Sequence, residues 1–136
     1  MTQLKSKKKL LIIEDDPANL KFLQMYLNRY FEVTICDSDT AFYEKIENEI
    51  YDLILMDISI RGEKNGLELT RELKSDPKYS LIPVICYTAH ALQKDRINAM
   101  DAGCDLFLNK PVNNAYLVRE LKKFLDKRDL AIDNDS

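Results

Sequence analysis

The sequence predicts an α/β fold in which five strands and five helices alternate to form one doubly wound parallel sheet. The first observation is a set of short apolar runs of strand length, spread along the chain. The second is that a stretch with apolar residues at helical spacing follows each run. Such alternation favours a parallel sheet that helices cover on both faces. With 136 residues, the chain has the usual length of one domain with one core.

Composition argues against several other classes of protein. Hydrophobic residues make up 46% and charged residues 32%, which indicates neither disorder nor low-complexity repeats. The net charge of −3 is too small to attract nucleic acid or an anionic membrane, so we expect neither as a partner. No apolar run is long enough to cross a bilayer, and the first residues lack the hydrophobic segment of a secretory signal. A cytoplasmic protein is therefore expected.

Three cysteines are widely spaced in a chain that has a single histidine. Their odd number and the absence of a C-x-x-C pair argue against a disulfide framework or a zinc site. We therefore expect Cys36, Cys86 and Cys104 to be small buried hydrophobic residues.

The first quarter of the chain is typical of a strand, a helix and a second strand. The apolar run Leu10–Ile13 predicts the first strand. Asp16 and Pro17 follow as a helix start, because Asp caps helices and Pro is tolerated at the first helical position. Phe31–Cys36 alternates apolar and polar residues, which favours an edge strand. The helix between them is expected to end near Arg29 and to bury an apolar stripe of Leu20, Leu23 and Leu27, widened by Phe22, Tyr26 and Tyr30.

The central strand is the clearest feature of the sequence. Leu53–Asp57 consists of four large apolar residues and a terminal aspartate, as expected of a strand buried on both faces. Before it, Asp37–Asp39 offers caps for a second helix that carries Ala41, Phe42, Ile46 and Ile50. After it, a polar loop leads to a third helix that carries Leu67, Leu69, Thr70 and Leu73 and stops at Ser75, Asp76 and Pro77.

The last part of the chain repeats the pattern twice. Leu81–Tyr87 is the predicted fourth strand, and the helix Ala91–Ala102 follows it and stops at Gly103. Asp105–Leu108 is a short fifth strand, after which Asn113 and Asn114 can cap the last helix. The apolar residues expected on these two helices are Leu92, Ile97 and Met100, and then Leu117, Leu121, Phe124 and Leu125.

Polar residues that suit phosphate chemistry end four of the predicted strands. In a parallel sheet these strand ends share one rim, which is where open α/β folds bind ligands. Neighbouring carboxylates raise one another's pKa unless a cation joins them. Oxygen ligands favour Mg²⁺ over zinc, and Mg²⁺ is commonly held by a few carboxylates and a phosphate. The residues that meet at this rim are Glu14, Asp15, Asp16, Asp57, Thr88 and Lys110.

With these motifs, the sequence resembles a response-regulator receiver domain of two-component signal transduction, in its single-domain, chemotaxis-type (CheY-like) form. The resemblance covers residues 9–128, with a basic leader at 1–8 and an acidic tail at 129–136. It implies the flavodoxin-like strand order 2-1-3-4-5. The segments that carry it are Leu11–Asp16, Leu53–Asp57, Tyr87–Ala89, Gly103–Asp105 and Phe107–Pro111.

The resemblance implies that Asp57 accepts a phosphoryl group from a sensor histidine kinase or a histidine phosphotransfer protein. Mg²⁺, which Mn²⁺ can replace, would bind Glu14, Asp15, Asp57 and the backbone carbonyl of Ser59, with Asp16 left to cap the helix. Thr88 and Lys110 would contact phosphoryl oxygens, and the Lys110–Pro111 peptide bond would be cis. The remaining residues are the switch aromatic Phe107 and the pocket-flanking Ala89 and His90.

The implied protein is a signalling switch and not an enzyme, because it catalyses only its own phosphorylation and dephosphorylation. Phosphorylation would favour one of two pre-existing conformations, since the contacts to Thr88 and Lys110 exist only in the active one. The surface of the fourth helix, fifth strand and fifth helix would then bind a downstream protein of unknown identity. Each residue also has a structural interpretation: Lys110 as a solvated loop lysine, Phe107 as core, Thr88 as a helix cap.

The loop after Asp57 departs from the family pattern. The proline that usually follows the aspartate strand is absent at Ile60 and Arg61, and Gly66 lies one position further from Asp57 than the usual glycine. The extra residue leaves the geometry of the metal loop, and hence the role of the Ser59 carbonyl, open.

Two other functions compete with the receiver hypothesis. A Mg²⁺-dependent phosphohydrolase also uses a strand-end aspartate, but such enzymes usually carry a second Asp two residues later, where this chain has Ser59, and no cap domain is visible. A degenerate receiver would bind partners without phosphorylation, against which the intact acidic, Thr88 and Lys110 positions argue.

Overall fold

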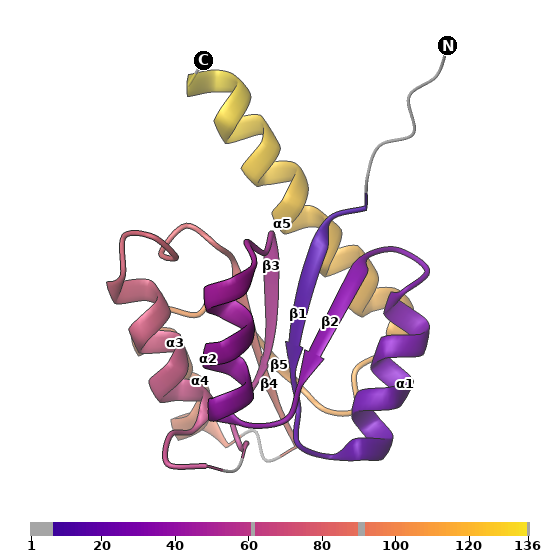
Figure 1. Ribbon diagram of the computed structural model, residues 1–136, viewed down its shortest axis with the longest axis vertical. Coiled ribbons are helices and arrows are strands. Elements are labelled where there is room, and N and C mark those ends of the chain that lie inside the picture. The colour runs from indigo at the N-terminus through magenta and orange to yellow at the C-terminus, as the bar shows by residue number, and fades with distance from the viewer. Residues whose placement is uncertain (1–6, 61, 90–91, 136) are drawn as a thin grey trace.

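The computed structural model describes residues 7–60, 62–89 and 92–135, and residues 127–135 through their backbone alone. In these residues a five-stranded parallel sheet has the order β2-β1-β3-β4-β5, which confirms the predicted fold class and strand order (Figure 1). The strands are β1 Lys9–Ile13, β2 Glu32–Cys36, β3 Leu53–Asp57, β4 Val84–Thr88 and β5 Leu106–Asn109. The helices are α1 Pro17–Leu27, α2 Asp39–Asn48, α3 Gly66–Ser75, α4 Gln93–Asp101 and α5 Asn114–Asp135.

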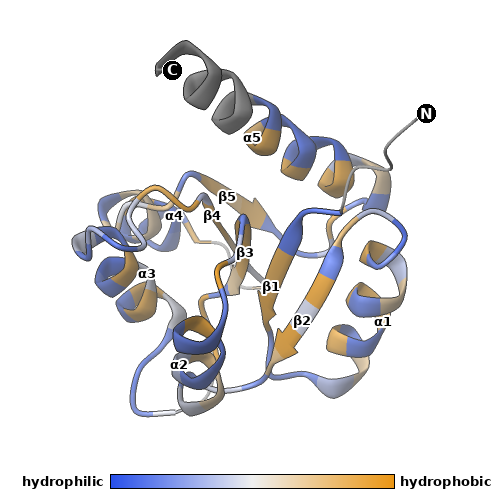
Figure 2. Ribbon diagram, turned by 45° about the horizontal axis from the view of Figure 1, so that its top comes forward, coloured by the Kyte–Doolittle hydropathy of each residue, from blue (hydrophilic) through white to orange (hydrophobic). Residues whose placement is uncertain are grey.

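Helices cover both faces of the sheet, α1 and α5 on one and α2, α3 and α4 on the other (Figure 1). The strand period of two residues explains how both faces are filled. In β1, Leu10 and Ile12 pack with α1 and α5, whereas Leu11 and Ile13 pack in the opposite cluster. β1 is hydrophobic after its first residue (Figure 2), and the same alternation makes β3 and β4 apolar up to their last residues, Asp57 and Thr88.

The edge position predicted for residues 31–36 is confirmed, because β2 pairs with β1 and ends the sheet on that side. The helix start at residue 16 is also confirmed, since the Asp16 carboxylate accepts a hydrogen bond from the Ala18 N–H at 3.1 Å. All three cysteines are free and buried, as expected. None of the helices in the described part of the chain is long and apolar enough to cross a membrane.

Several predicted apolar contacts are wrong. The apolar stripe expected on α4 is exposed: Leu92, Ile97 and Met100 lie largely in solvent, and Ala99 is the buried residue of the helix. Ile50 follows α2 instead of lying in it, and Leu81 precedes β4, so both side chains are exposed. Phe22 is exposed as well and does not widen the buried stripe of α1, which consists of Leu20, Leu23 and Leu27.

The last helix is longer than the sequence indicates. The tail expected to begin at Asp129 continues the backbone of α5 as far as Asp135. The end of α5 projects past the sheet, at the end opposite to the one where the strands terminate (Figure 1). Asn113 precedes this helix and accepts a hydrogen bond from the Tyr116 N–H at 3.0 Å, which confirms the expected cap.

Candidate functional site

The ends of four strands bring the polar residues identified in the sequence to one rim of the sheet. Glu14 follows β1, Asp57 and Thr88 end β3 and β4, and Lys110 follows β5. The Lys110 ammonium lies 2.9 Å from Glu14 Oε1 and 3.1 Å from Asp57 Oδ2. Both carboxylates are almost inaccessible, with 1% of Glu14 and 2% of Asp57 exposed. Two buried acids therefore share one cation.

Local backbone structure fixes the Asp57 carboxylate. Its Oδ1 accepts hydrogen bonds from the Ser59 N–H at 2.9 Å and from the Ser59 hydroxyl at 2.8 Å. Its other oxygen, Oδ2, points to Lys110. Gly66 packs against the peptide that follows, because a Cβ atom at this position would lie 2.3 Å from the Asp57 carbonyl oxygen. The position next to the strand end therefore requires glycine.

The two acids differ in pKa because their surroundings differ. Burial, together with the proximity of Asp57, raises the pKa of Glu14 to about 7. Burial also acts to raise the pKa of Asp57, but the hydrogen bonds from Glu14 and Ser59 and the charge of Lys110 outweigh it and keep this pKa below its usual range. Burial acts to lower the pKa of Lys110, yet the two carboxylates hold it above the usual value. Near neutral pH, Asp57 is the ionised acid and Glu14 the one poised to titrate.

Three carboxylates lie close enough together to hold a divalent cation. Glu14, Asp15 and Asp57 each offer one oxygen, and these atoms lie within 4.8 Å of one another. An oxygen-only set suits a hard ion such as Mg²⁺. Asp16 caps α1 instead of joining this set. Ser59 contacts Asp57 through its amide and hydroxyl, and the metal role of its carbonyl remains a prediction.

Of the other site residues predicted from the sequence, Thr88 and Phe107 are buried in the described structure. Thr88 is buried, and its carbonyl accepts a hydrogen bond from the Lys110 N–H at 2.9 Å. The Lys110–Pro111 peptide bond is cis, as expected. Phe107 is buried in the core cluster of Ala99, with the Arg96 guanidinium 5.2 Å from its ring centre. His90 lies outside the described residues.

Sequence reasoning missed two neighbours of the buried acids. The Asn19 side chain, in the first turns of α1, donates a hydrogen bond to Glu14 Oε1. Tyr87 places its ring 4.4 Å from the Lys110 ammonium, and its buried hydroxyl has no hydrogen-bond partner within the described residues. Burial, and then the nearby Glu14 and Asp57, raise the pKa of Tyr87. The available signal was positional, because Tyr87 directly precedes Thr88 at the end of β4.

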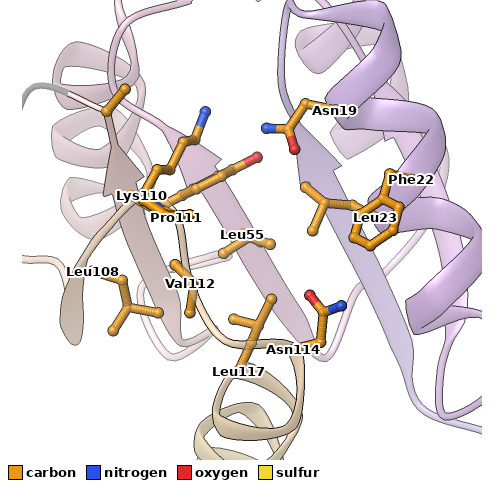
Figure 3. A pocket seen from close by; sticks show the side chains of 12 residues that line it. Asn19, Phe22, Leu23, Leu55, Leu108, Lys110, Pro111, Val112, Asn114 and Leu117 are labelled. Atoms are coloured by element: carbon orange, nitrogen blue, oxygen red, sulfur yellow. The ribbon is translucent and has the colours of Figure 1, made fainter.

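A cavity of about 400 Å³ adjoins the site between α1 and the start of α5. Figure 3 shows Lys110 and Asn19 at one end of this cavity, with Leu55, Val112 and Leu117 further along it. The exposed Ala89 also lines it. Lys110 therefore faces both the buried acids and an open, largely apolar space.

Comparisons with known proteins agree with this geometry. A family model described as response regulator receiver domain matches residues 10–122. The polar-differentiation response regulator DivK of Brucella ovis is 31% identical over 119 residues, which cover 87% of this chain and 96% of DivK. The chain spans only 26% of the length of another relative, the response regulator PleD of Caulobacter vibrioides, to which it is 35% identical over 121 residues.

Solved structures that are similar to this chain are receiver domains as well. A CheY-like receiver domain protein from Methanospirillum hungatei is 30% identical with a TM-score of 0.85, and the match covers 93% of this chain and 99% of that one. The receiver domain of the sensor histidine kinase PA1611 from Pseudomonas aeruginosa is 31% identical with a TM-score of 0.80, covering 89% and 99% of the two chains. That structure has a magnesium ion coordinated in its active-site cleft.

Proposed function

Because this chain belongs to the response-regulator receiver domain family, we propose that it accepts a phosphoryl group on Asp57 from a phosphohistidine of a partner protein. The partner is a sensor histidine kinase or a histidine phosphotransfer protein. The observation that carries the proposal is the ionised Asp57, fixed at a strand end with Glu14, Asp15 and Lys110 around it. A carboxylate in this setting is a nucleophile for phosphorus.

The two oxygens of the Asp57 carboxylate have different roles in the phosphoryl transfer. Ser59 holds Oδ1, so Oδ2 is the oxygen that attacks phosphorus. The new O–P bond forms as the N–P bond of the phosphohistidine breaks, and the imidazole nitrogen keeps the electron pair. Lys110, which contacts Oδ2, moves with little displacement onto a phosphoryl oxygen. The buried Thr88 supplies a hydroxyl to another.

Glu14, Asp15 and Asp57 would hold Mg²⁺, with the carbonyl of Ser59 as a further ligand. When bound, the ion neutralises the negative charge that phosphorylation adds. The three carboxylates could not tolerate this charge alone, since Lys110 provides a single positive charge for two of them. Replacement by Mn²⁺ and a cytoplasmic location remain predictions.

Phosphorylation then shifts the chain between two conformations. Contacts of the phosphoryl group to Thr88 and Lys110 favour the conformation in which both residues reach it. Thr88 pairs with Asn109 in the sheet, two residues after Phe107 in β5, and Lys110 directly follows this strand. The exposed apolar residues Leu92, Ile97 and Met100 support α4, β5 and α5 as the surface that a downstream protein binds.

Acetyl phosphate with Mg²⁺, followed by intact mass measurement, tests the proposal. We expect one phosphoryl adduct on the wild type, none on Asp57→Asn, and an unchanged adduct on Asp101→Asn, which alters an exposed surface acid. Continued release of many phosphates per chain would support the phosphohydrolase hypothesis instead. An absence of any adduct on the wild type would support a degenerate receiver.

A further inference from the structure

The loop between β3 and α3 contacts the end of β3 through both its first and its last residues. At its start, Ser59 binds the Asp57 carboxylate, and at its end the Gly66 N–H donates to the Ile58 carbonyl at 3.2 Å. This loop is one residue longer than the family pattern. Between these two points, residues of α2 and α3 contact the loop at Lys64.

Asp39, the first residue of α2, reaches across to this loop. The N-cap of α2 is Ser38, whose hydroxyl accepts the bond from the Ala41 N–H at 3.2 Å, while Asp39 Oδ1 accepts a hydrogen bond from the Thr40 N–H at 2.9 Å. The other oxygen, Asp39 Oδ2, accepts a hydrogen bond from the Lys64 N–H of the loop at 3.1 Å. Only 8% of Asp39 is exposed, and the hydrogen bonds from the Lys64 and neighbouring amides keep its pKa below the usual range.

Gly62 makes the approach of Asp39 possible. Its φ of +134° is a conformation that side chains disfavour, and a Cβ atom here would lie 2.3 Å from Asp39 Oδ1. The carboxylate therefore fills the space of the missing side chain. The loop at Gly62 and the first residue of α2 therefore pack directly against each other.

The side chain of Lys64 holds the loop from its other side. Its ammonium lies 2.7 Å from Glu72 Oε1 on α3 and 5.5 Å from the ring centre of Tyr43 on α2. The Tyr43 hydroxyl donates to the second oxygen of Glu72 at 2.6 Å. A single loop residue thus connects both helices, through its backbone to α2 and through its side chain to Glu72 of α3 and Tyr43 of α2.

We propose that Asp39 and Lys64 are positioning residues that hold the loop after Asp57 in the conformation that magnesium binding requires, so that α2 sets the magnesium affinity of the site. The loop is fixed at Ser59 by Asp57 and at Lys64 by Asp39, with the buried Ile60 between these two points. The backbone that these anchors orient includes the Ser59 carbonyl. This inference rests on the proposed function, because that function places a metal ligand on this loop.

Magnesium titration of the unphosphorylated protein tests the proposal, with hydrogen exchange of the loop amides as a second readout. We expect Asp39→Ala to weaken magnesium binding about tenfold, since a charge-assisted hydrogen bond is lost, and to speed exchange of the Lys64 amide. Asp39→Asn retains an acceptor oxygen and should restore part of both. Lys64→Met removes the Glu72 ion pair but keeps the amide, and should give a smaller loss than Asp39→Ala.

Asp37→Asn is the matched control, because Asp37 is an exposed acid two residues away, and it should leave both readouts unchanged. Faster exchange of the Lys64 amide in Asp39→Ala with unaltered magnesium affinity would overturn the proposal, as would unaltered exchange. Acetyl phosphate labelling of the wild type is run beside these titrations. A wild type that takes up phosphate while Asp39→Ala binds magnesium normally refutes this inference alone, whereas an unlabelled wild type refutes the proposed function.

Discussion

Glu14 and Asp57 face the same ammonium group, yet only Glu14 is set to change charge near neutral pH. Asp57 receives two hydrogen bonds from Ser59 besides its contact with Lys110. Glu14 is as deeply buried but lies beside an acid that is already ionised, so a second negative charge is disfavoured. The buried pair therefore stores a proton that a divalent cation would displace.

This proton predicts how the stability of the metal-free protein depends on pH. The pKa of Glu14 rises on folding from 4.5 to about 7, so the folded state keeps a proton that the unfolded chain loses. The contribution is fully present below pH 4.5 and is lost as the pH rises through 7, an effect on the order of 1–3 kcal/mol. Urea unfolding in a chelator at several pH values should show this fall in the wild type and not in Glu14→Gln. Parallel curves for the two proteins would contradict it.

Gly66 carries a second prediction. A methyl group there would meet the Asp57 carbonyl and the Ile58 backbone, neither of which can move freely because they belong to the strand end. We expect Gly66→Ala to lower the free energy of unfolding by about 1–3 kcal/mol and to slow phosphorylation by acetyl phosphate. In Gly103→Ala the left-handed φ of +99° costs stability, but the nearest atoms belong to the flexible Lys74 side chain, far from the site. An unchanged phosphorylation rate in both variants would show that the contact at residue 66 is structural only.

At the scale of elements, the sequence predicts the strands better than the helix faces. Each central strand is recognisable because both of its faces are buried, so a run such as Leu53–Met56 has no polar interruption. Helical spacing does not tell whether an apolar side is covered. On α4 the small Ala99 reaches the core, and the larger apolar residues remain outside.

The residues of the site also differ in how well the sequence predicts them. Residues that end strands could be predicted, since the topology of a parallel sheet places them together. Asn19 and Asp39 could not, because their contacts depend on how a helix or a side chain is turned after folding. Nothing in the residue pattern distinguishes Asp39 from the acids around it.

The exposure of α4 predicts that its apolar residues do little for stability. Ile97→Gln should change the free energy of unfolding by less than about 0.5 kcal/mol, because Ile97 is 58% exposed. Leu69→Ala in α3, which removes a fully buried side chain, should cost about 2–5 kcal/mol. Denaturant unfolding of both variants makes the comparison. A loss for Ile97→Gln close to that of Leu69→Ala would mean that α4 packs more deeply than its exposure indicates.

At the scale of the whole molecule, the site is a property of the fold and not of one segment. Glu14, Asp57 and Lys110 lie far apart in the sequence and meet only when β1, β3 and β5 have taken their places in the sheet. An unfolded chain offers no such cluster. Ligands of this site must therefore bind the folded state almost exclusively, and their binding free energy adds to the stability of the entire sheet.

Magnesium should accordingly raise the thermal midpoint of the whole domain. At a concentration ten times the dissociation constant, binding adds about 1.4 kcal/mol, which corresponds to roughly 3–6 °C for a domain of this size. The measurement is a thermal melt across a magnesium series, with sodium chloride at matched ionic strength as the control for screening. Asp57→Asn removes one of the three clustered carboxylates and should weaken the dependence. The protein could bind magnesium in titration and yet show a melting temperature that does not change with magnesium concentration. That result would mean that the unfolded chain binds the ion equally well and that the strand ends do not create the site.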